Sequence, residues 1–409
     1  MIKFIKGIIG DYKKVEEHVF YLVIAQFFMQ IVNTAFFILF NFYMTKLGYQ
    51  DYDITAFFSY RFLAIMVLGI PLGFFIKGKK LVGFFYVSAI GMPFFSLLVI
   101  LSAEMGNEVL LRIFMMMVGV TFAAMQACAL PFIMLNAKKE HHSEAFALYF
   151  QTWGAAIFLI GMLNYLLNTL NPVLFSERNV MIGCCLLGFV AVFFLRKITI
   201  EEQISKKIKM RPDDFKLILK AVFPTLIIAV GAGFTIPVIN LFFLNVHGVE
   251  SKYFSVLSAI TYLLVPIGVT FIPYIRKNFG YKTAITLFQS LSIIALFLMA
   301  TTELYKHWDI AIYVALFFYI IRQPLMNVAG PMTSELTMYY VGKRNQEFIS
   351  AINSSIWSGS WLFSLTLFSW LRQMEIRYVS IFMITVLLYM VGVFWYYLLI
   401  KEFDAREKT

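Results

Sequence analysis

The sequence predicts an all-α integral membrane protein in which twelve membrane-spanning helices form two six-helix bundles. Three observations lead to this prediction. Hydrophobic residues make up 61% of the chain and charged residues only 14%, whereas soluble proteins average about 45–50% and about 25%. The apolar residues form continuous runs of about 20, the length that a helix needs to cross a bilayer. Short sequence similarities also recur at a spacing of roughly 200 residues, as expected of a chain built from two repeats.

Each predicted helix is an apolar run bounded by charged or turn-forming residues, without the two-residue alternation of a membrane β-strand. The first run follows charged residues from Asp11 to Glu17 and has no small-residue cleavage site after it, so we expect it to remain in the mature protein. In chain order the helices are expected at 17–45, 53–76, 81–102, 108–133, 145–169, 178–196, 217–246, 252–275, 281–302, 309–333, 347–371 and 376–401.

A polar stretch near the middle of the chain, from Arg196 to Lys216, separates six predicted helices from six. Pro212 and the two aspartates that follow it predict the start of the seventh helix. We therefore expect an N-terminal bundle over 1–196, a cytoplasmic connector over 197–216 and a C-terminal bundle over 217–409.

The orientation in the membrane follows from the Lys and Arg residues. Of the 34 in the chain, 25 fall on the termini and one set of alternate loops, and 6 fall on the other set. Because cytoplasmic loops carry the excess of basic residues, we expect both termini to be cytoplasmic. The remaining three basic residues lie inside predicted helices and are Arg61, Arg112 and Arg322.

The composition also excludes several classes of protein. So little polar surface cannot cover a soluble enzyme, and the net charge of +11 reflects membrane topology rather than a nucleic-acid footprint. The three cysteines lie in apolar runs without metal-ligand spacing. No nucleotide-binding loop or catalytic constellation is present in the sequence. We expect a protein that is not an enzyme and that has no cofactor and no metal site.

The two halves of the chain share short features at offsets of 200 to 203 residues. Four such pairs favour two six-helix bundles of the same topology, related by an axis along the membrane normal because each bundle has an even number of spans. The pairs are Gly48 and Gly248, Pro131 and Pro331, Glu144 and Glu347, and the Ile-Pro steps that begin at Ile70 and Ile272.

This six-plus-six layout, with internal termini and a basic central connector, resembles the major facilitator superfamily. That superfamily has a signature loop between helices two and three, in outline Gly-x-x-x-Asp-Arg-x-Gly-Arg-Arg. The corresponding segment here keeps the glycines and the basic end but lacks the acidic residue, and it contains Gly73, Lys77, Lys79 and Lys80. Its second copy retains Arg276 and Lys277. The resemblance implies alternating access, with substrate held between the halves near the middle of the membrane.

Polar residues inside apolar helices are costly, so they are candidate functional groups. Gln26, Gln30 and Asn33 share one face of the first helix. The resemblance implies that the first helix of each half lines the central cavity, so these amides are candidate substrate contacts. Hydrogen bonds that hold neighbouring helices together are the alternative.

The seventh helix, the repeat partner of the first, contains Gly231, Gly233, Pro237 and Asn240. Glycine and proline inside a membrane helix permit a break or bend. We therefore predict a gating segment at these positions, with tight packing of small residues as the alternative, and Asn240 as a further substrate contact.

Arg322 lies deep in the tenth predicted helix, near the middle of the membrane. A permanent charge at that depth is expected to face the protein interior or water and to pair with another group. We predict that Arg322 anchors an anionic group of the substrate, together with Gln323 and Asn327. A structural ion pair or carbonyl contact is the alternative.

The eleventh helix adds Asn353 and, one turn later, Trp357 as candidate contacts. Trp357 and Trp361 are placed to stack on a substrate ring, although aromatic side chains in such helices also serve as packing and interfacial anchors.

Together these features predict a secondary active or facilitative transporter of a small solute that bears an anionic group, working by alternating access. The expected partners are the lipid bilayer, the small-molecule substrate and a proton or counter-ion, with no nucleic acid and a monomeric protein. A bacterial cytoplasmic membrane is the expected location. Two alternatives remain: an exporter of lipophilic or cationic compounds, and a membrane protein that handles lipid or binds a partner without transport.

Overall fold

The computed structural model describes residues 15–76, 79–138, 141–200, 215–270, 280, 282–341 and 346–407. Within these ranges the chain is helical and contains no strand. Nine helices among the described residues are long and apolar enough to cross a membrane. The all-α membrane fold predicted from the sequence is confirmed.

Contacts divide the chain into two compact units. The first unit comprises Met1–Tyr43 and Leu63–Lys209, and the second comprises Met44–Phe62 and Met210–Thr409. The domain boundaries expected at 196 and 217 remain predictions.

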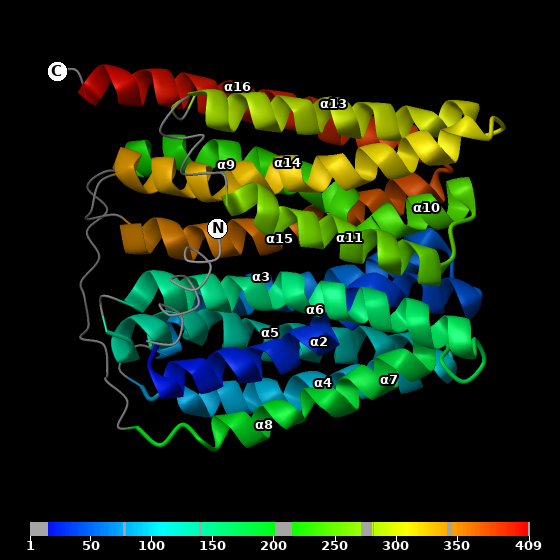
Figure 1. Ribbon diagram of the computed structural model, residues 1–409, viewed down its shortest axis with the longest axis horizontal. Helices are drawn as coiled ribbons and strands as arrows, with labels where there is room; N and C mark the ends of the chain where they lie inside the picture. Colours follow the sequence, from blue (N-terminus) through cyan, green and yellow to red (C-terminus); the bar gives the residue numbers. More distant parts are fainter. Residues whose placement is uncertain are drawn as a thin grey trace, which may run out of the picture. The chain divides into compact units, whose positions relative to one another are not determined.

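In the first unit, α4 packs against α5, α7 and α8 (Figure 1). A hydroxyl of Ser88 on α4 donates to the backbone oxygen of Thr121 on α5 at 2.6 Å, which joins these helices inside the apolar interior. The helices of this part of the chain are α2 (Glu17–Lys46), α3 (Asp51–Ile76), α4 (Val82–Glu104), α5 (Glu108–Asn136), α6 (His142–Leu170), α7 (Glu177–Gly188) and α8 (Val190–Leu195), and α3 begins in the second unit.

In the second unit, α9 packs on α15 and α16, while α13 packs along α14 and α16. This packing surrounds the interior of the unit with five long helices. The elements are α9 (Phe215–Thr235), η2 (Ile236–Val238), α10 (Ile239–His247), α11 (Ser251–Thr270), η3 (Thr283–Leu287), α13 (Phe288–Thr301), η4 (Thr302–Tyr305), α14 (Ile310–Val341), α15 (Gln346–Gln373) and α16 (Tyr378–Glu407).

The observed helices follow the predicted runs closely, with differences where the backbone departs from α-helical geometry. The sixth run is divided at Phe189 into α7 and α8, and the seventh is divided by the 3₁₀ turn η2. The tenth helix continues to Val341, past its predicted end at 333, because the apolar pattern is followed by residues that still favour a helix.

The internal repeat is visible in the backbone. Gly48 follows α2 and Gly248 follows α10, and both have positive φ values, +92° and +67°. An L side chain rarely adopts this conformation, so glycine at the same place in both halves has the same physical cause. The pairing of α4 with α5 is likewise repeated by α13 with α14.

The predicted loop between the second and third helices is described in part. Gly73 lies in the last turn-and-a-half of α3. Lys79 places its ammonium 3.1 Å from the centre of the Phe75 ring, and Lys80 is exposed. Lys77, Arg276 and Lys277 lie outside the described residues.

The three cysteines are free thiols buried inside helices of the first unit. Cys128 and Cys185 have no exposed surface, and Cys184 is 5% exposed. Among the described residues, no group of His, Cys, Asp and Glu is arranged to hold a metal ion.

Candidate functional site

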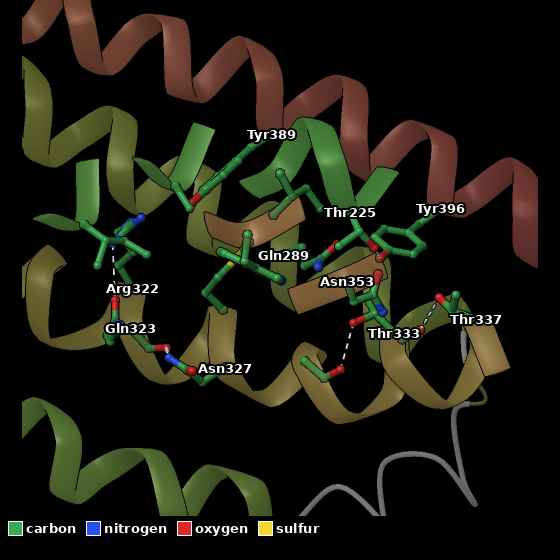
Figure 2. Close-up of a pocket in the computed structure, with 16 residues that line it drawn as sticks. Thr225, Gln289, Arg322, Gln323, Asn327, Thr333, Thr337, Asn353, Tyr389 and Tyr396 are labelled. Atoms are coloured by element: carbon green, nitrogen blue, oxygen red, sulfur yellow. Dashed lines mark hydrogen bonds between the residues drawn. The ribbon is translucent and has the colours of Figure 1, made fainter. Parts of the chain in front are cut away.

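A cavity of about 300 Å³ lies inside the second unit (Figure 2). This volume is at the lower end of the range for small-molecule sites. The described lining comes from α9, η2, α13, α14, α15 and α16, so the whole of it belongs to one compact unit. The polar lining residues are Thr225, Gln289, Arg322, Gln323, Asn327, Thr333, Thr337, Asn353, Tyr389 and Tyr396.

Arg322 provides the one formal charge among the described lining residues. Its side chain is only 1% exposed. Nη1 donates to Oε1 of Gln323 at 3.3 Å, whereas Nε and Nη2 have no hydrogen-bond partner. The hydroxyl of Tyr389 lies near the guanidinium without the geometry of a hydrogen bond. Arg322 is therefore a buried cation with an unused pair of donors.

Hydrogen bonds to the backbone and to a side chain hold Arg322 and its neighbours in place. The Ser292 hydroxyl on α13 donates to the backbone oxygen of Arg322 at 3.2 Å, which ties α14 to α13 beside the cavity. Gln323 donates from Nε2 to the Tyr262 hydroxyl on α11 at 3.2 Å. Asn327 donates from Nδ2 to the backbone oxygen of Gln323 at 2.8 Å. The amides after Arg322 are thus fixed by structural hydrogen bonds.

Two further amides offer unused acceptors. Gln289 is 3% exposed, and neither its Oε1 nor the Oδ1 of Asn353 has a hydrogen-bond partner. Leaving a buried polar atom unpaired costs about 1–3 kcal/mol, more when the group is charged. The residues that line the cavity thus include a buried cation with unpaired donors and two amides with unpaired, buried oxygens.

The hydroxyls at the other end of the cavity have hydrogen-bond partners within the protein. Thr225 and Tyr396 lie 2.9 Å apart, and the Thr337 hydroxyl donates to the backbone oxygen of Thr333 at 2.7 Å. Figure 2 shows these groups around the same hollow as Arg322. They provide a polar surface with no free charge.

Five of the residues predicted from the sequence lie together around this cavity. They are Arg322, Gln323, Asn327, Asn353 and Trp357. Trp357 is 38% exposed, and its ring centre lies 6.4 Å from that of Trp361. The sequence reasoning missed Gln289, although a glutamine inside an apolar helix is the same signal that identified the others. Tyr389 and Tyr396 gave no such signal, because tyrosine is common in this chain.

The amides of the first helix are placed elsewhere. Gln26, Gln30 and Asn33 are all buried in α2 of the first unit and do not line this cavity. Asn33 donates from Nδ2 to Oε1 of Gln30 at 2.8 Å, while Nε2 of Gln26 has no partner. Their role as substrate contacts remains a prediction.

The predicted gating segment contains both tight packing and a break. A Cβ on Gly231 would lie 2.9 Å from the Tyr389 ring, and one on Gly233 would lie 2.6 Å from Cβ of Ser364. The break comes after these glycines, where Pro237 lies in η2. Asn240 follows in α10, where it is buried and accepts a hydrogen bond from the Leu241 N–H at 3.0 Å. It does not line the cavity.

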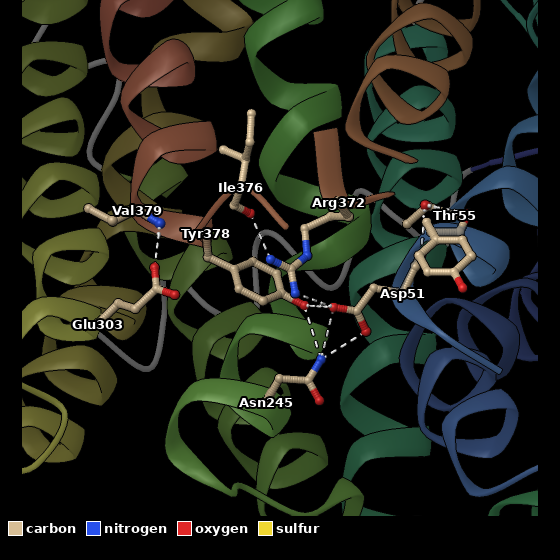
Figure 3. Close-up of polar contacts among 9 residues, drawn as sticks. Asp51, Thr55, Asn245, Glu303, Arg372, Ile376, Tyr378 and Val379 are labelled. Atoms are coloured by element: carbon tan, nitrogen blue, oxygen red, sulfur yellow. Dashed lines mark hydrogen bonds and ion pairs between the residues drawn. The ribbon is translucent and has the colours of Figure 1, made fainter. Parts of the chain in front are cut away.

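A second polar cluster of the same unit surrounds Asp51, the first residue of α3 (Figure 3). Asn245 donates from Nδ2 to both carboxylate oxygens, at 2.8 and 3.0 Å. Arg372 forms an ion pair with the carboxylate at 3.3 Å, and the Tyr378 hydroxyl donates to it as well. The Ser369 hydroxyl donates to the backbone oxygen of Tyr52 at 2.7 Å. These contacts bind the segment Met44–Phe62 to the second unit.

No family model and no curated protein sequence matches the chain. Several solved structures do match it. A bacterial homologue of the human lysosomal transporter Spinster, in an inward-facing and occupied conformation, has a TM-score of 0.69 at 13% identity over 94% of this chain and 96% of that chain. A bacterial homologue of the iron transporter ferroportin has a TM-score of 0.72 at 13% identity, with 94% and 98% covered.

A third structure, the POT family transporter PepTSo, has a TM-score of 0.73 at 11% identity, with 93% and 98% covered. The chain has the major facilitator fold. The fold expected from the resemblance noted in the sequence is confirmed. At these identities the likeness concerns the fold alone.

Proposed function

We propose that the protein is an alternating-access transporter of a small hydrophilic solute that carries an anionic group. The observation that carries the proposal is the buried guanidinium of Arg322, whose Nε and Nη2 have no partner at the wall of a cavity of about 300 Å³. Removing a charge from water is expensive unless it is paired, so this group favours an anion.

The free edge of the guanidinium also specifies the shape of the anion. Nε and Nη2 lie on the same side of the planar group, and two parallel N–H donors match two oxygens of one carboxylate or phosphate. Nη1 is already used by Gln323. The anionic group is therefore bound through two oxygens by Arg322, and the hydroxyls of the solute donate to Gln289 and Asn353.

Transport rather than static binding is supported by the fold. The solved structures with the same fold are named as transporters, and the chain matches them over nearly its whole length. No carboxylate is found among the described residues that line the cavity. A cationic substrate would therefore meet repulsion from Arg322 without a compensating charge.

The test is thermal unfolding of the purified protein with glycerate, gluconate, sorbitol and choline. Glycerate or gluconate is expected to raise the melting temperature of the wild type, because a ligand at 100 times its Kd adds about 2.7 kcal/mol to stability. Arg322→Lys is expected to respond weakly, and Arg322→Gln is expected to show no response.

Arg112→Gln is the matched control, since Arg112 is an exposed arginine on α5 that pairs with Glu108 at 2.6 Å. It should respond as the wild type does. Removing the unpaired charge is not expected to lower stability, so Arg322→Gln without ligand should melt at or above the wild-type temperature. Equal stabilisation of wild type and Arg322→Gln by the anions would contradict the proposal, and stabilisation by choline alone would favour the exporter of cations.

A further inference from the structure

We propose that the exposed surface of α13 and α16 binds one anionic phospholipid, whose phosphate is held by Lys282 and Lys401 and whose acyl chains lie along the two helices. This surface belongs to the second unit, at the end of α16 where the chain terminates. Neither lysine lines the cavity of Figure 2, so the inference does not depend on what that cavity binds.

The apolar part of the surface comes from two neighbouring helices, because α13 and its first turn η3 pack against α16 (Figure 1). Each side carries a row of exposed apolar side chains at intervals of three or four residues, a spacing that places them on one face of a helix. The rows are Leu287, Leu291 and Ile294 on η3 and α13, and Met390, Phe394 and Leu398 on α16. Lipid tails are as apolar as these side chains and cover such rows in a membrane.

Each row ends in an exposed lysine. On α16, Lys401 follows Leu398 by three residues, and before α13, Lys282 precedes Leu287 by five. An interval of five does not return to the same face of an α-helix, but η3 is a π-helix, in which hydrogen bonds join residues five apart. The π turn therefore brings Lys282 to the face that carries Leu287.

A contact between the two helices brings the lysines close to each other. The ammonium of Lys282 lies 5.0 Å from the centre of the Tyr397 ring on α16. Tyr397 is one turn before Lys401, and residues four apart on a helix have Cβ atoms about 5–6 Å from each other. The two long, flexible side chains can therefore reach the oxygens of a single phosphate.

The positive charge of these lysines is not neutralised by the acidic residues beside them. Glu402, next to Lys401 in the sequence, forms ion pairs with Lys220 and, at 2.7 Å, with Arg406. Asp404 is exposed and forms no ion pair with any described residue. A phosphate diester provides the missing negative charge, and anionic lipids are enriched in the cytoplasmic leaflet, on the side where this end of the chain is expected.

An anionic phospholipid matches both parts of the surface at once. Its phosphate accepts hydrogen bonds from the two ammonium groups, and its acyl chains cover the two apolar rows. A soluble anion contacts only the lysines. A zwitterionic lipid carries an ammonium of its own, which the lysines repel.

The experiment is native mass spectrometry of the purified full-length protein titrated with dioleoyl phosphatidylglycerol, dioleoyl phosphatidylcholine or inorganic phosphate. The two lipids have the same acyl chains and differ in net charge. We expect the first phosphatidylglycerol to bind about 25-fold more tightly than phosphatidylcholine, because each basic residue near an anionic lipid contributes about fivefold in affinity. Equal affinity for the two lipids would overturn the proposal, and so would binding of inorganic phosphate as tight as that of phosphatidylglycerol.

Variants locate the lipid on this surface. Lys282→Gln and Lys401→Gln should each lower the affinity for phosphatidylglycerol about fivefold and leave that for phosphatidylcholine unchanged. Both side chains are exposed and without an ion pair to a described residue, so both variants should melt like the wild type in detergent without lipid.

Lys216→Gln is the matched control, since it removes an exposed lysine from the beginning of α9 and changes the net charge by the same amount. It should bind phosphatidylglycerol as the wild type does. A loss of affinity in Lys216→Gln equal to that in the other two variants would mean that net charge alone attracts the lipid, and the proposal would fail. The double variant of Lys282 and Lys401 should still be stabilised by glycerate or gluconate, so this inference and the proposed function can fail separately.

Discussion

At the scale of single residues, the hydrogen-bond partner of a polar side chain can be predicted from the sequence only when the partner lies within the same helix. Arg112 pairs with Glu108 one turn earlier, and Asn33 donates to Gln30 within the same helix. The sequence spacing alone indicates both contacts. Arg322 has no such neighbour, and only the three-dimensional packing shows that this buried arginine belongs to the lining of a cavity.

Glu16 shows how a local charge is expected to affect stability. It precedes α2, and its Oε1 accepts hydrogen bonds from the Lys138 N–H at 3.0 Å and from Nδ1 of His141 at 3.2 Å. Burial acts to raise the pKa of this carboxyl, but hydrogen bonds from its own backbone N–H, from Lys138 and from His141 outweigh it and hold the pKa below its usual 4.5.

A lowered pKa in the folded protein means that the ionised group adds stability above the usual value, and that this stability is lost as the pH falls through the folded-state pKa. We expect Glu16→Gln to lower the melting temperature at pH 7 and to melt like the wild type near pH 3, where the carboxyl is protonated in both states. Melting curves from pH 3 to 8 check this. Glu17→Gln, which loses a contact with Tyr21 in its own helix, is the control and should leave the loop contacts intact. A deficit of equal size at every pH would contradict the expectation.

At the scale of helices, apolar runs and end signals in the sequence predict well where the helices lie. They predict less well what happens where a helix is interrupted. Runs of apolar residues are imposed by the membrane, so they are visible in the sequence. Pro237 predicts the break after Thr235, but not the contacts beside it: the Thr235 hydroxyl lies 2.9 Å from that of Thr385, which also donates to the backbone oxygen of Gly231 at 3.0 Å. Such partners cannot be read from the local sequence.

Replacing each of the two glycines of α9 by alanine is expected to have a different effect, on stability at Gly233 and on ligand binding at Gly231. A Cβ on Gly233 would lie 2.6 Å from Cβ of Ser364 and 3.1 Å from Cα of Trp361, atoms that no side-chain rotation can move. We expect Gly233→Ala to cost about 1–3 kcal/mol through overpacking. A Cβ on Gly231 would lie 2.9 Å from the Tyr389 ring, which can tilt, and 3.4 Å from Cβ of Leu388, an ordinary contact distance, so Gly231→Ala should weaken anion binding more than stability.

Melting temperatures and ligand-induced shifts of both variants distinguish these effects. Gly154→Ala is the control, because nothing lies within 4 Å of a Cβ there. It should be neutral, or stabilising by up to about 1 kcal/mol from helix propensity. If Gly233→Ala melts like Gly154→Ala, the close packing of α9 against α15 is not as tight as the distances indicate.

At the scale of the whole molecule, the number of helices, the two repeats and the fold class follow from composition and pattern. Only part of the site can be predicted from the sequence. Arg322, Gln323 and Asn327 are close together in the sequence, so they are recognised as a group. Gln289 and Tyr389 belong to other helices, and only the packing of those helices brings them to the same cavity. The Asp51 cluster was not predicted at all. Its members come from α3, α10, α15 and α16, and none of them is unusual where it stands in the sequence.

This cluster is expected to hold the beginning of α3 in the second unit. Asp51 and Arg372 are mostly buried, with side chains 12% and 21% exposed. We expect Asp51→Asn and Arg372→Gln each to destabilise the protein and their effects not to add, with a coupling of about 0.5–3 kcal/mol in a double-mutant cycle. Chemical unfolding of the four proteins measures it.

The pair between Lys252 and Glu250, at 3.6 Å and more exposed, provides the comparison. The same cycle there should give a coupling of about 0–1 kcal/mol, as is typical of surface ion pairs. Strict additivity of the Asp51 and Arg372 substitutions would mean that the two residues contribute independently.

The burial of Cys128, Cys184 and Cys185 has a practical consequence for spectroscopy. Thiol reagents dissolved in water attack the accessible thiolate, so buried sulfurs in an apolar surrounding react slowly. A cysteine introduced at an exposed loop position would therefore take up a fluorophore or spin label selectively, while the native thiols stay unmodified. Distance measurements between two such labels can follow motions of this protein in the wild-type background, without first replacing the cysteines buried in its first unit.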